Sequence, residues 1–200
     1  MTKFYYCIRP DYKHRSLQDW RHYDDTEATD EYQNEVYVSA RALAKDGDRI
    51  LDVGTGSGFK LLKYFKDFDT LGLDIEPTLS WLKQHHSDRT WGESNLSVTP
   101  KGKFGVVICS DVIEHIPDPD VMMSFLSSID FDYLIMSTPE RDNLCGSEEA
   151  GPPLNTAHYR EWNLEEFKNY VGQYFNVRSH FLSNHKQKIS TQLAVLTKRH

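Results

Sequence analysis

A short apolar strand that runs directly into a glycine-rich loop constrains this chain more than any other feature. Residues 49–53 are largely apolar, residues 54–58 read Gly-Thr-Gly-Ser-Gly, and a helical pattern follows over residues 59–65. Strand, glycine loop and helix in this order are typical of a parallel sheet, because a parallel connection needs a crossover, usually a helix, to return the chain. The loop then lies at the carboxyl edge of the sheet, where open α/β folds bind ligands.

Apolar runs and helical periodicities alternate along the rest of the chain. This alternation predicts the α/β class, with a Rossmann-like seven-stranded, mostly parallel sheet and helices on both faces. The last two strands are joined by a short polar segment, which predicts a C-terminal antiparallel β-hairpin. Further strands are predicted at residues 71–74, 89–93, 104–109, 133–137, 175–182 and 190–197, further helices at residues 31–45, 77–85, 118–127 and 164–174, and a long polar loop at residues 139–161.

The length of 200 residues suits one α/β domain and is too short for two ordinary ones. We therefore expect a single domain over residues 1–200, with a core over residues 48–200. Residues 1–47 are expected to form an N-terminal helical cap, whose aromatic and acidic part, residues 4–32, makes the second wall of a ligand pocket.

Net charge, cysteine spacing and the length of the apolar runs limit the partners and locations that the chain is expected to have. The net charge of -7 works against unspecific attraction to nucleic-acid backbones. From Arg178 onward the chain has basic residues and no acidic ones, which a solvated hairpin explains more simply than an anion-binding face. Cys7, Cys109 and Cys145 are widely spaced and are expected to be reduced thiols, and no apolar run is long enough to span a membrane, so a cytoplasmic location is expected.

The spacing of the loop glycines separates two kinds of nucleotide site. Gly54, Gly56 and Gly58 give G-x-G-x-G, whereas the dinucleotide fingerprint of oxidoreductases needs its third glycine one residue later. Asp74 ends the second predicted strand, where a carboxylate can accept hydrogen bonds from two ribose hydroxyls. Asp52 precedes the loop and is expected to tether its backbone amides and to help attract a cationic ligand.

Three runs together resemble a known family. Residues 50–58, 71–74 and 104–115 look like motifs I, II and IV of class I S-adenosylmethionine-dependent methyltransferases, in the right order and spacing, and the resemblance extends from residue 50 to the terminal hairpin. It implies that S-adenosylmethionine is bound by the glycine loop, by Asp74 and by the edge of the third and fourth strands. The residues that the resemblance places around this cofactor are Asp52, Gly54, Thr55, Gly56, Gly58, Asp74, Ile75, Asn95, Leu96 and Ser110.

One position departs from the family pattern. Many members have an Asp after the third strand, where it holds the adenine, whereas this chain offers Ser94 or Asn95. The assignment of Asn95 therefore rests on its place and not on its residue type.

The segment after the fourth strand carries candidate catalytic groups. Methyl transfer is an in-line displacement, so holding donor and acceptor in line supplies much of the catalysis. A hydroxyl acceptor also gains from losing its proton, which calls for a general base or a metal ion. Asp111, Glu114 and His115 lie within reach of one another if this segment is helical.

A second cluster, residues 155–163, contains His158 shortly before Glu-Trp. Together with the first cluster it resembles two metal-assisted branches of the family, the small RNA 3′-terminal 2′-O-methyltransferases and the ubiquinone-pathway O-methyltransferases. This resemblance implies Asp111, Glu114, His115 and His158 as ligands of a divalent ion such as Mn²⁺, Mg²⁺ or Zn²⁺. Glu-His before Ile-Pro also occurs in members without metal, where it braces the loop, and His115 or His158 is then the candidate base, with Glu114 beside it.

The long loop resembles that of bacterial methyltransferases that modify glycans or other small molecules. Loops of this length are often lids or binding loops. Arg141 and Arg160 would suit an anionic acceptor, and Tyr159 and Trp162 would stack on a sugar or ring, although anchoring of the loop explains all four equally well.

Three functions therefore stay open. The acidic charge and short length favour O-methylation of a small-molecule or glycan hydroxyl, and the two-part metal motif favours a metal-dependent RNA 2′-O-methyltransferase. The third is a non-catalytic module that binds S-adenosylmethionine or activates a partner. A dinucleotide oxidoreductase is disfavoured by the glycine spacing and the terminal hairpin.

Overall fold

A computed structural model describes residues 5–19, 26, 33–183 and 191–199 of the chain. Its strands are β1 (Arg49–Val53), β2 (Asp69–Asp74), β3 (Thr90–Glu93), β4 (Lys103–Ser110), β5 (Asp130–Pro139), β6 (Phe175–Ser183) and β7 (Thr191–Lys198). Its helices are α1 (Asn34–Leu43), α2 (Phe59–Tyr64), α3 (Thr78–His85), α4 (Pro119–Ser128), α5 (Arg141–Cys145) and α6 (Leu164–Val171), with short 3₁₀ turns η1 (Tyr5–Cys7) and η2 (Ile113–His115).

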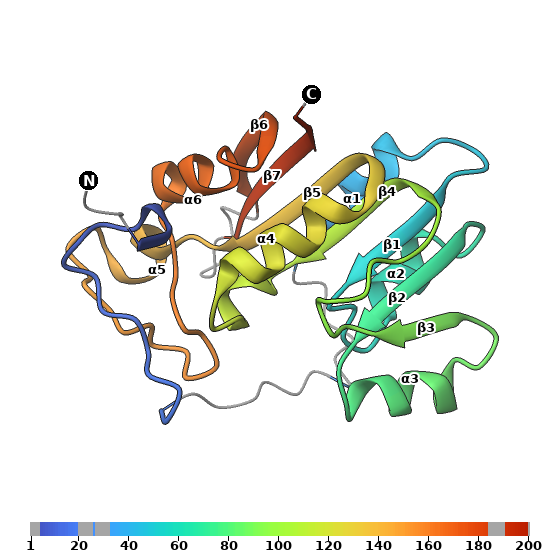
Figure 1. Cartoon of the computed structure of the whole chain (residues 1–200), viewed down its shortest axis with the longest axis horizontal. Helices are drawn as coiled ribbons and strands as arrows, with labels where there is room; N and C mark the ends of the chain where they lie inside the picture. The colour runs from blue at the N-terminus through green and yellow to red at the C-terminus, as the bar shows by residue number, and fades with distance from the viewer. Residues whose placement is uncertain (1–4, 20–25, 27–32, 184–190, 200) are drawn as a thin grey trace.

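The seven strands form one sheet in the order β3-β2-β1-β4-β5-β7-β6 (Figure 1). Strands β1 to β5 pair in parallel, and β7 runs antiparallel to both β5 and β6. The predicted fold class, including the reversed C-terminal strand, is therefore confirmed.

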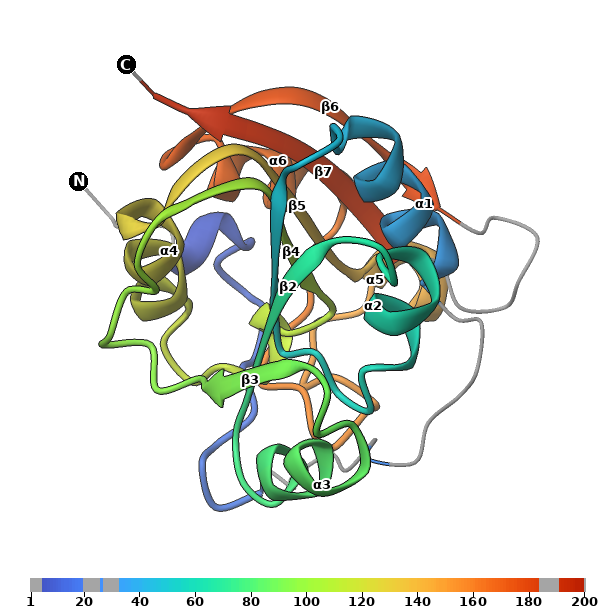
Figure 2. The ribbon, with the colours of Figure 1, turned by 90° about the vertical axis from the view of Figure 1, so that its right-hand side faces the viewer.

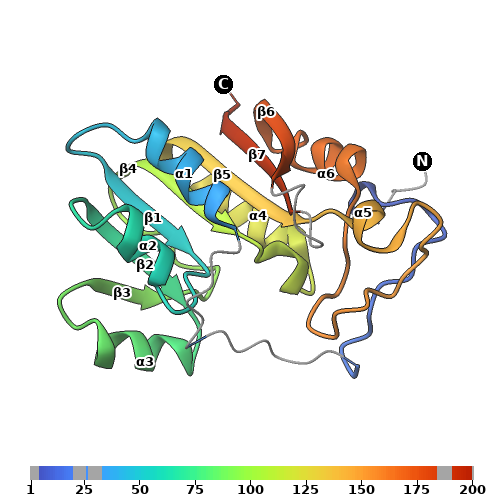
Figure 3. The same ribbon diagram turned by 180° about the vertical axis from the view of Figure 1, so that it is seen from behind.

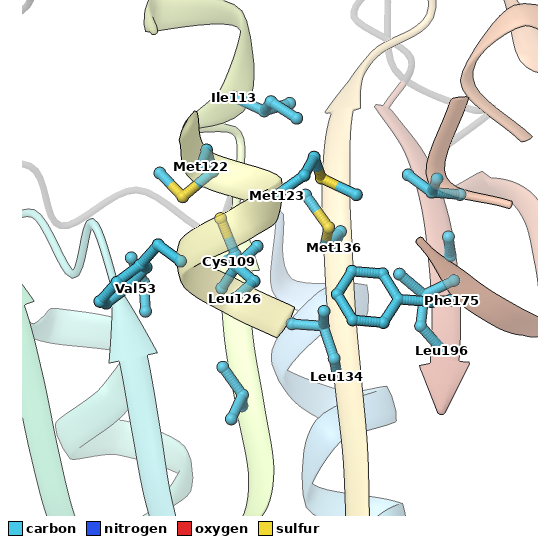
Figure 4. Packing of buried hydrophobic residues seen from close by; sticks show 14 of the residues in the cluster. Val53, Cys109, Ile113, Met122, Met123, Leu126, Leu134, Met136, Phe175 and Leu196 are labelled. Carbon is cyan, nitrogen blue, oxygen red and sulfur yellow. The ribbon is translucent and has the colours of Figure 1, made fainter. Parts of the chain in front are cut away.

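Helices cover both faces of the sheet because neighbouring strand residues point to opposite sides. On β4, Val107 and Cys109 join a cluster with α4 and α6, while Val106 and Ile108 join a second cluster with α1, α2 and α3. Figure 2 shows α4 on one side of the sheet and α1 and α2 on the other, and Figure 3 shows the second face directly. Figure 4 shows the α4 side, where Met122, Met123 and Leu126 of the helix meet sheet side chains such as Cys109 and Met136.

The element bounds differ from the predicted ones in a few informative places. The strand predicted at 133–137 is β5 and starts at Asp130, because the polar residues Asp130 and Asp132 alternate with buried Phe131. The helix predicted at 31–45 is α1, which starts at Asn34, and residues 31 and 32 lie outside the described part. The loop predicted at 139–161 contains α5, whose first turn is capped by the Glu140 side chain.

The N-terminal segment also differs from the expected helical cap. Helix α1 packs against β4 and β5 as part of a helical layer, since Val36, Tyr37 and Ala40 are buried against the sheet. Residues 5–19 contain only the turn η1 as helix and run alongside the loop of residues 140–163 (Figures 1 and 3). Among the described residues, no helix is long and apolar enough to cross a membrane.

Candidate active site

The glycine loop leaves β1 in a conformation that only glycine adopts easily. Gly54, Gly56 and Gly58 have φ of 74°, 55° and 73°. At Gly54 a Cβ atom would lie 2.4 Å from Cγ2 of Val112, so any side chain there would collide with the segment that follows β4. The loop backbone is therefore held close to the carboxyl ends of both β1 and β4.

Asp74 braces this loop from the end of β2. Its Oδ2 accepts a hydrogen bond from the Gly56 amide at 2.7 Å, and its Oδ1 accepts one from the Ile75 amide at 2.8 Å. A carboxylate fixed in this way faces the loop at the sheet edge, where it can also receive ligand hydroxyls. Ile75, next in the chain, is 45% exposed and offers apolar surface beside it.

Asp52 lies beneath the loop and is completely buried. Its Oδ2 accepts hydrogen bonds from the Tyr37 hydroxyl at 2.9 Å and from Thr55 Oγ1 at 3.0 Å, whereas its Oδ1 has no partner among the described residues. Burial raises the pKa of Asp52 to about 7, although both hydrogen bonds oppose the rise. An unpaired carboxylate oxygen beneath a glycine loop fits a cationic ligand group above it.

The loop after β3 is organised by its own side chains. Asn95 Oδ1 accepts hydrogen bonds from the backbone amides of Ser97 and Val98 and from the Ser97 hydroxyl, which makes it a turn residue. Leu96 adopts a φ of 56° and packs on the α4-side core. The roles of Asn95 and Leu96 at an adenine ring stay predictions, and the turn gives Asn95 a structural function in addition.

The ends of β4 and β5 bring three polar side chains together. Ser110 and Ser137 are paired in register, and their Oγ atoms are 3.0 Å apart. Asp111 follows with a φ of 51°, and its Oδ1 accepts a hydrogen bond from Ser137 Oγ at 2.6 Å. Its Oδ2 accepts from Gln33 Nε2 at 2.7 Å and from Thr191 Oγ1 at 3.3 Å. The Asp111 carboxylate is thus tied to strand ends and to the start of α1.

Glu114, His115 and His158 form the chemically richest group in the described part of the chain. One nitrogen or oxygen atom from each lies within 4.8 Å of the others, and the two imidazole centroids are 4.8 Å apart. Glu114 is fully buried; its Oε2 accepts a hydrogen bond from Thr138 Oγ1 at 3.0 Å, and its Oε1 has no partner among the described residues. Burial, and then the nearby Asp111 carboxylate, raise the pKa of Glu114 well above its usual range.

Hydrogen bonds between two distant segments create this group. The Tyr159 amide donates to the Glu114 carbonyl at 2.8 Å, and His115 Nδ1 contacts the Ala157 carbonyl at 2.9 Å. The Arg160 guanidinium donates to the Ile116 carbonyl at 2.6 Å and to the Pro117 carbonyl. We call this pairing of residues 114–117 with residues 157–160 the clasp. The segment around Glu114 forms only the short turn η2, and the clasp places His158 beside His115.

The N-terminal segment braces the clasp from outside. Arg15 donates from Nε to the His158 carbonyl at 3.1 Å and from its guanidinium to the Pro153 carbonyl, while its amide donates to the Tyr159 carbonyl at 2.8 Å. The Tyr12 hydroxyl accepts from the Glu161 amide at 3.0 Å. The position of His158 therefore depends on residues near the start of the chain.

Arg141 and Arg160 serve as anchors of the loop. Arg141 is 1% exposed and forms an ion pair with Glu166 at 2.7 Å. Arg160 is 3% exposed, binds the carbonyls of the clasp and lies over the rings of Tyr6 and Trp162. These contacts favour anchoring over the binding of an anionic acceptor.

The sequence analysis did not predict some hydrogen-bond partners of the site residues. Glu161 contacts His158 Nδ1, Asn155 contacts His158 Nε2, and Thr138 contacts Glu114. The spacing of three residues between His158 and Glu161 is a signal that could have pointed to one of them. Asp111, expected as a fourth metal ligand, is not part of the three-residue group, and its ligand role stays a prediction.

Comparisons with known proteins agree with this geometry. The family model of a methyltransferase domain matches residues 20–180. A ubiquinone biosynthesis O-methyltransferase of Xanthomonas axonopodis pv. citri is 30% identical over 102 residues, which is 46% of this chain and 42% of that protein. The match therefore spans less than half of the relative's length.

Solved structures share the fold at low identity. The magnesium protoporphyrin IX methyltransferase of Synechocystis with bound S-adenosylhomocysteine has a TM-score of 0.64 and 19% identity, covering 84% of each chain. A putative methyltransferase of Haloferax volcanii, solved in complex with the Trm112 methyltransferase activator, has a TM-score of 0.67 and 15% identity, covering 88% of this chain and 94% of its own. With a family model that covers most of its length, the chain belongs to the methyltransferase-domain family, and it shares the fold of S-adenosylmethionine-dependent methyltransferases.

Proposed function

We propose that this methyltransferase transfers the methyl group to a hydroxyl of a small molecule or glycan. The observation that carries the proposal is the group of Glu114, His115 and His158 at the carboxyl edge of the sheet, in which Glu114 and His158 are buried and His115 is half-buried. Methylation of a hydroxyl needs a route for its proton, and this group supplies two imidazoles and a carboxylate. The partial match to a ubiquinone biosynthesis O-methyltransferase supports an oxygen acceptor.

The residues divide the work between the two ligands. S-adenosylmethionine supplies a methyl group that is already activated on a sulfonium. The glycine loop and Asp74 would hold this donor, and the unpaired Oδ1 of Asp52 favours its cationic end. An imidazole nitrogen of His158 or His115 would take the hydroxyl proton as the oxygen forms its bond to the methyl carbon and the sulfur–carbon bond breaks.

A divalent ion is a second way to handle the same proton. The donor set fits such an ion, because the buried Oε1 of Glu114 has no partner among the described residues and two imidazoles lie beside it. Glu114, His115 and His158 would hold the ion, with Asp111 as the fourth ligand that the family resemblance implies. The ion would lower the pKa of a bound hydroxyl, and vicinal hydroxyls would suit it best. This observation keeps the RNA 2′-O-methyltransferase as the second candidate function.

The first test is turnover by the purified enzyme with S-adenosylmethionine and three acceptor classes: catechols, glycans, and short RNA with a 3′-terminal ribose. We expect product carrying a methyl ether from a catechol or glycan, identified by mass spectrometry. Turnover confined to RNA would support the second candidate. Tight binding of S-adenosylhomocysteine without turnover on any hydroxyl would contradict O-methylation and support the non-catalytic module.

Calorimetry separates the metal-assisted and metal-free forms of the proposal. Mn²⁺ or Mg²⁺ is titrated into metal-stripped protein saturated with S-adenosylhomocysteine, with His158→Ala and a control variant, His85→Ala. His85 lies exposed on α3, stacked on Trp81. Saturable binding that is lost only in His158→Ala would support the metal site, and no binding to the wild type would overturn it and leave an imidazole as the base.

A further inference from the structure

His158 is held at both ring nitrogens. Its Nδ1 lies 2.6 Å from Oε1 of Glu161, and its Nε2 lies 3.0 Å from Nδ2 of Asn155. His158 and Glu161 are both buried, with 6% and 3% of their surfaces exposed. The ring is therefore fixed by two neighbours of opposite hydrogen-bonding character.

The orientation of the Asn155 amide follows from its other contact. Oδ1 of Asn155 accepts a hydrogen bond from the Ala157 amide at 2.9 Å. An amide nitrogen has no acceptor capacity, so Nδ2 must be the group that faces His158 and must donate to Nε2. Nε2 therefore carries a lone pair and no proton.

The remaining ring proton is then on Nδ1, facing Glu161. An ionised carboxylate only accepts hydrogen bonds, which agrees with this assignment. A doubly protonated ring would place a second N–H against the NH2 group of the Asn155 amide, so that two hydrogen-bond donors would face each other. The contacts on both sides thus select one neutral tautomer of His158.

We propose that Glu161 is a positioning residue for the transfer reaction: it holds His158 as the Nδ1–H tautomer, so that Nε2 offers its lone pair to the acceptor site. The inference rests on the proposed function, in which His158 handles the hydroxyl proton. Carboxylates that accept from the far nitrogen of a functional histidine fix its tautomer and ring orientation in this way.

The surroundings hold Glu161 itself in place. Its amide donates to the Tyr12 hydroxyl at 3.0 Å, and its carbonyl accepts from Arg141 Nη1 at 3.3 Å. These backbone bonds leave the side chain to serve His158. The same geometry is useful to a hydroxyl and to a metal ion, because each needs an unprotonated Nε2. A hydroxyl or a metal ion that binds Nε2 would replace the NH2 group of the Asn155 amide there.

Nitrogen-15 NMR of the imidazole tests the assignment without any methyl acceptor. The samples are metal-stripped protein with S-adenosylhomocysteine, in the wild type and in Glu161→Gln, Glu161→Ala and Asn155→Asp. We expect the wild type to show a protonated Nδ1 and an unprotonated Nε2. Glu161→Gln should keep this pattern, since its amide oxygen still accepts from Nδ1–H. Glu161→Ala leaves the ring held from the Asn155 side alone, so we expect a larger share of the Nε2–H tautomer than in the wild type.

Asn155→Asp is the matched variant that changes the pattern at Nε2. It keeps the Oδ1 atom that accepts from Ala157 but replaces the donor at Nε2 with an acceptor. Because Glu161 still accepts from Nδ1–H, we expect both ring nitrogens of His158 to carry a proton in this variant. Loss of packing alone would not add a proton to Nε2.

Steady-state kinetics, with the acceptor that the turnover test identifies, supply the second readout. Glu161→Ala and Asn155→Asp should lower kcat by about 10- to 100-fold, Glu161→Gln should stay within about threefold of the wild type, and the Kd of S-adenosylhomocysteine should not change. An Nε2–H tautomer in the wild type would overturn the inference, as would wild-type kcat in Glu161→Ala. If Glu161→Ala does not fold, Glu161→Gln and Asn155→Asp decide the question.

The two proposals fail in different ways. A wild type that methylates no hydroxyl contradicts the proposed function, while its NMR pattern still decides whether Glu161 fixes the tautomer. A wild type that methylates a hydroxyl but shows the wrong tautomer contradicts only the role of Glu161.

Discussion

The proposed donor side, which is the glycine loop with Asp52 and Asp74, and the proposed acceptor side, which is the clasp with Glu161, are built from contacts of very different sequence separation. At the donor side, Asp52 contacts Thr55 and Tyr37, 3 and 15 residues away, and Asp74 contacts Gly56, 18 residues away. At the acceptor side, His115 meets Ala157 across 42 residues, and Glu161 meets Tyr12 across 149. These donor-side hydrogen bonds thus join residues no more than 18 positions apart, whereas the acceptor side joins segments up to 149 positions apart.

This difference indicates which part of the fold can change its ligand without a change in the sheet. The donor side depends on strand ends and on a glycine loop whose hydrogen bonds to Asp52 and Asp74 join residues close in sequence. The acceptor side depends on the clasp and on an N-terminal segment that is laid over it, and changes there leave the sheet intact. Substitutions on the two sides should therefore affect different measurements.

The largest separation is expected from His158→Ala. Loss of a group that handles the acceptor proton should lower kcat by roughly 100- to 10,000-fold. The Kd of S-adenosylhomocysteine should stay within about twofold, since His158 lies on the acceptor side. Steady-state kinetics and calorimetry measure the two effects, with His85→Ala as the control. An equal loss of cofactor binding would show that the two sides are not separable.

Among the substitutions considered, Arg160→Met should lower the free energy of unfolding the most. The variant leaves the Ile116 and Pro117 carbonyls without their donor in a buried clasp, which should lower the free energy of unfolding by about 2 to 4 kcal/mol. Urea denaturation of the wild type and the variant measures this effect. Arg178→Met, on an exposed position of β6, is the control and should change stability by less than about 0.5 kcal/mol. Equal stability of Arg160→Met and the wild type would refute the clasp as a stabilising contact.

Asp52→Asn tests the donor side through its pH dependence. Because burial raises the pKa of Asp52 from 3.8 to about 7, the folded state favours the neutral carboxyl. The stabilising contribution of this group is complete below pH 4 and is lost as the pH rises toward 7. Asparagine has no such titration, so from pH 5 to pH 8 the variant should gain roughly 2 to 3 kcal/mol of stability relative to the wild type. Denaturation at several pH values measures it, and parallel curves would contradict the raised pKa.

Asp74→Asn should give the smallest effect and should be confined to cofactor binding. An amide keeps one acceptor oxygen for the Gly56 amide but loses the charge that strengthens a bond to a ribose hydroxyl. We expect the Kd of S-adenosylhomocysteine to rise about tenfold, with kcat at saturating S-adenosylmethionine nearly unchanged. Calorimetry and kinetics test this, and a drop in kcat without a change in Kd would place Asp74 outside the donor site.

The donor side was predictable from the sequence because its signals are local. The strand periods, the spacing of Gly54, Gly56 and Gly58, and Asp74 at the end of a strand are all readable within 25 residues. The structure places the loop and Asp74 in contact. The alternation of strands and helices predicted a mostly parallel sheet, but the order β3-β2-β1-β4-β5-β7-β6 comes from the structure.

The acceptor side was less predictable for a physical reason. His158 and Glu114 were named as ligands by resemblance. Glu161 and Asn155 contact His158 from an irregular loop, where no hydrophobic periodicity predicts the direction of a side chain. The sequence left open whether Asp111, Glu114 and His115 are helical, and the structure shows a 3₁₀ turn whose neighbouring carbonyls accept hydrogen bonds from residues 159 and 160. Such long-range hydrogen bonds cannot be read from local propensity.

The reach of the N-terminal segment also sets an order of assembly. Trp162 donates to the Tyr6 carbonyl across 156 residues at 2.9 Å, so the first turn of the chain waits for a partner near the end of the loop. The hydrogen bonds that join Asp52 and Asp74 to the glycine loop link residues no more than 18 positions apart. During synthesis, these hydrogen bonds can therefore form before the clasp, which closes only when the last third of the chain arrives to meet the first.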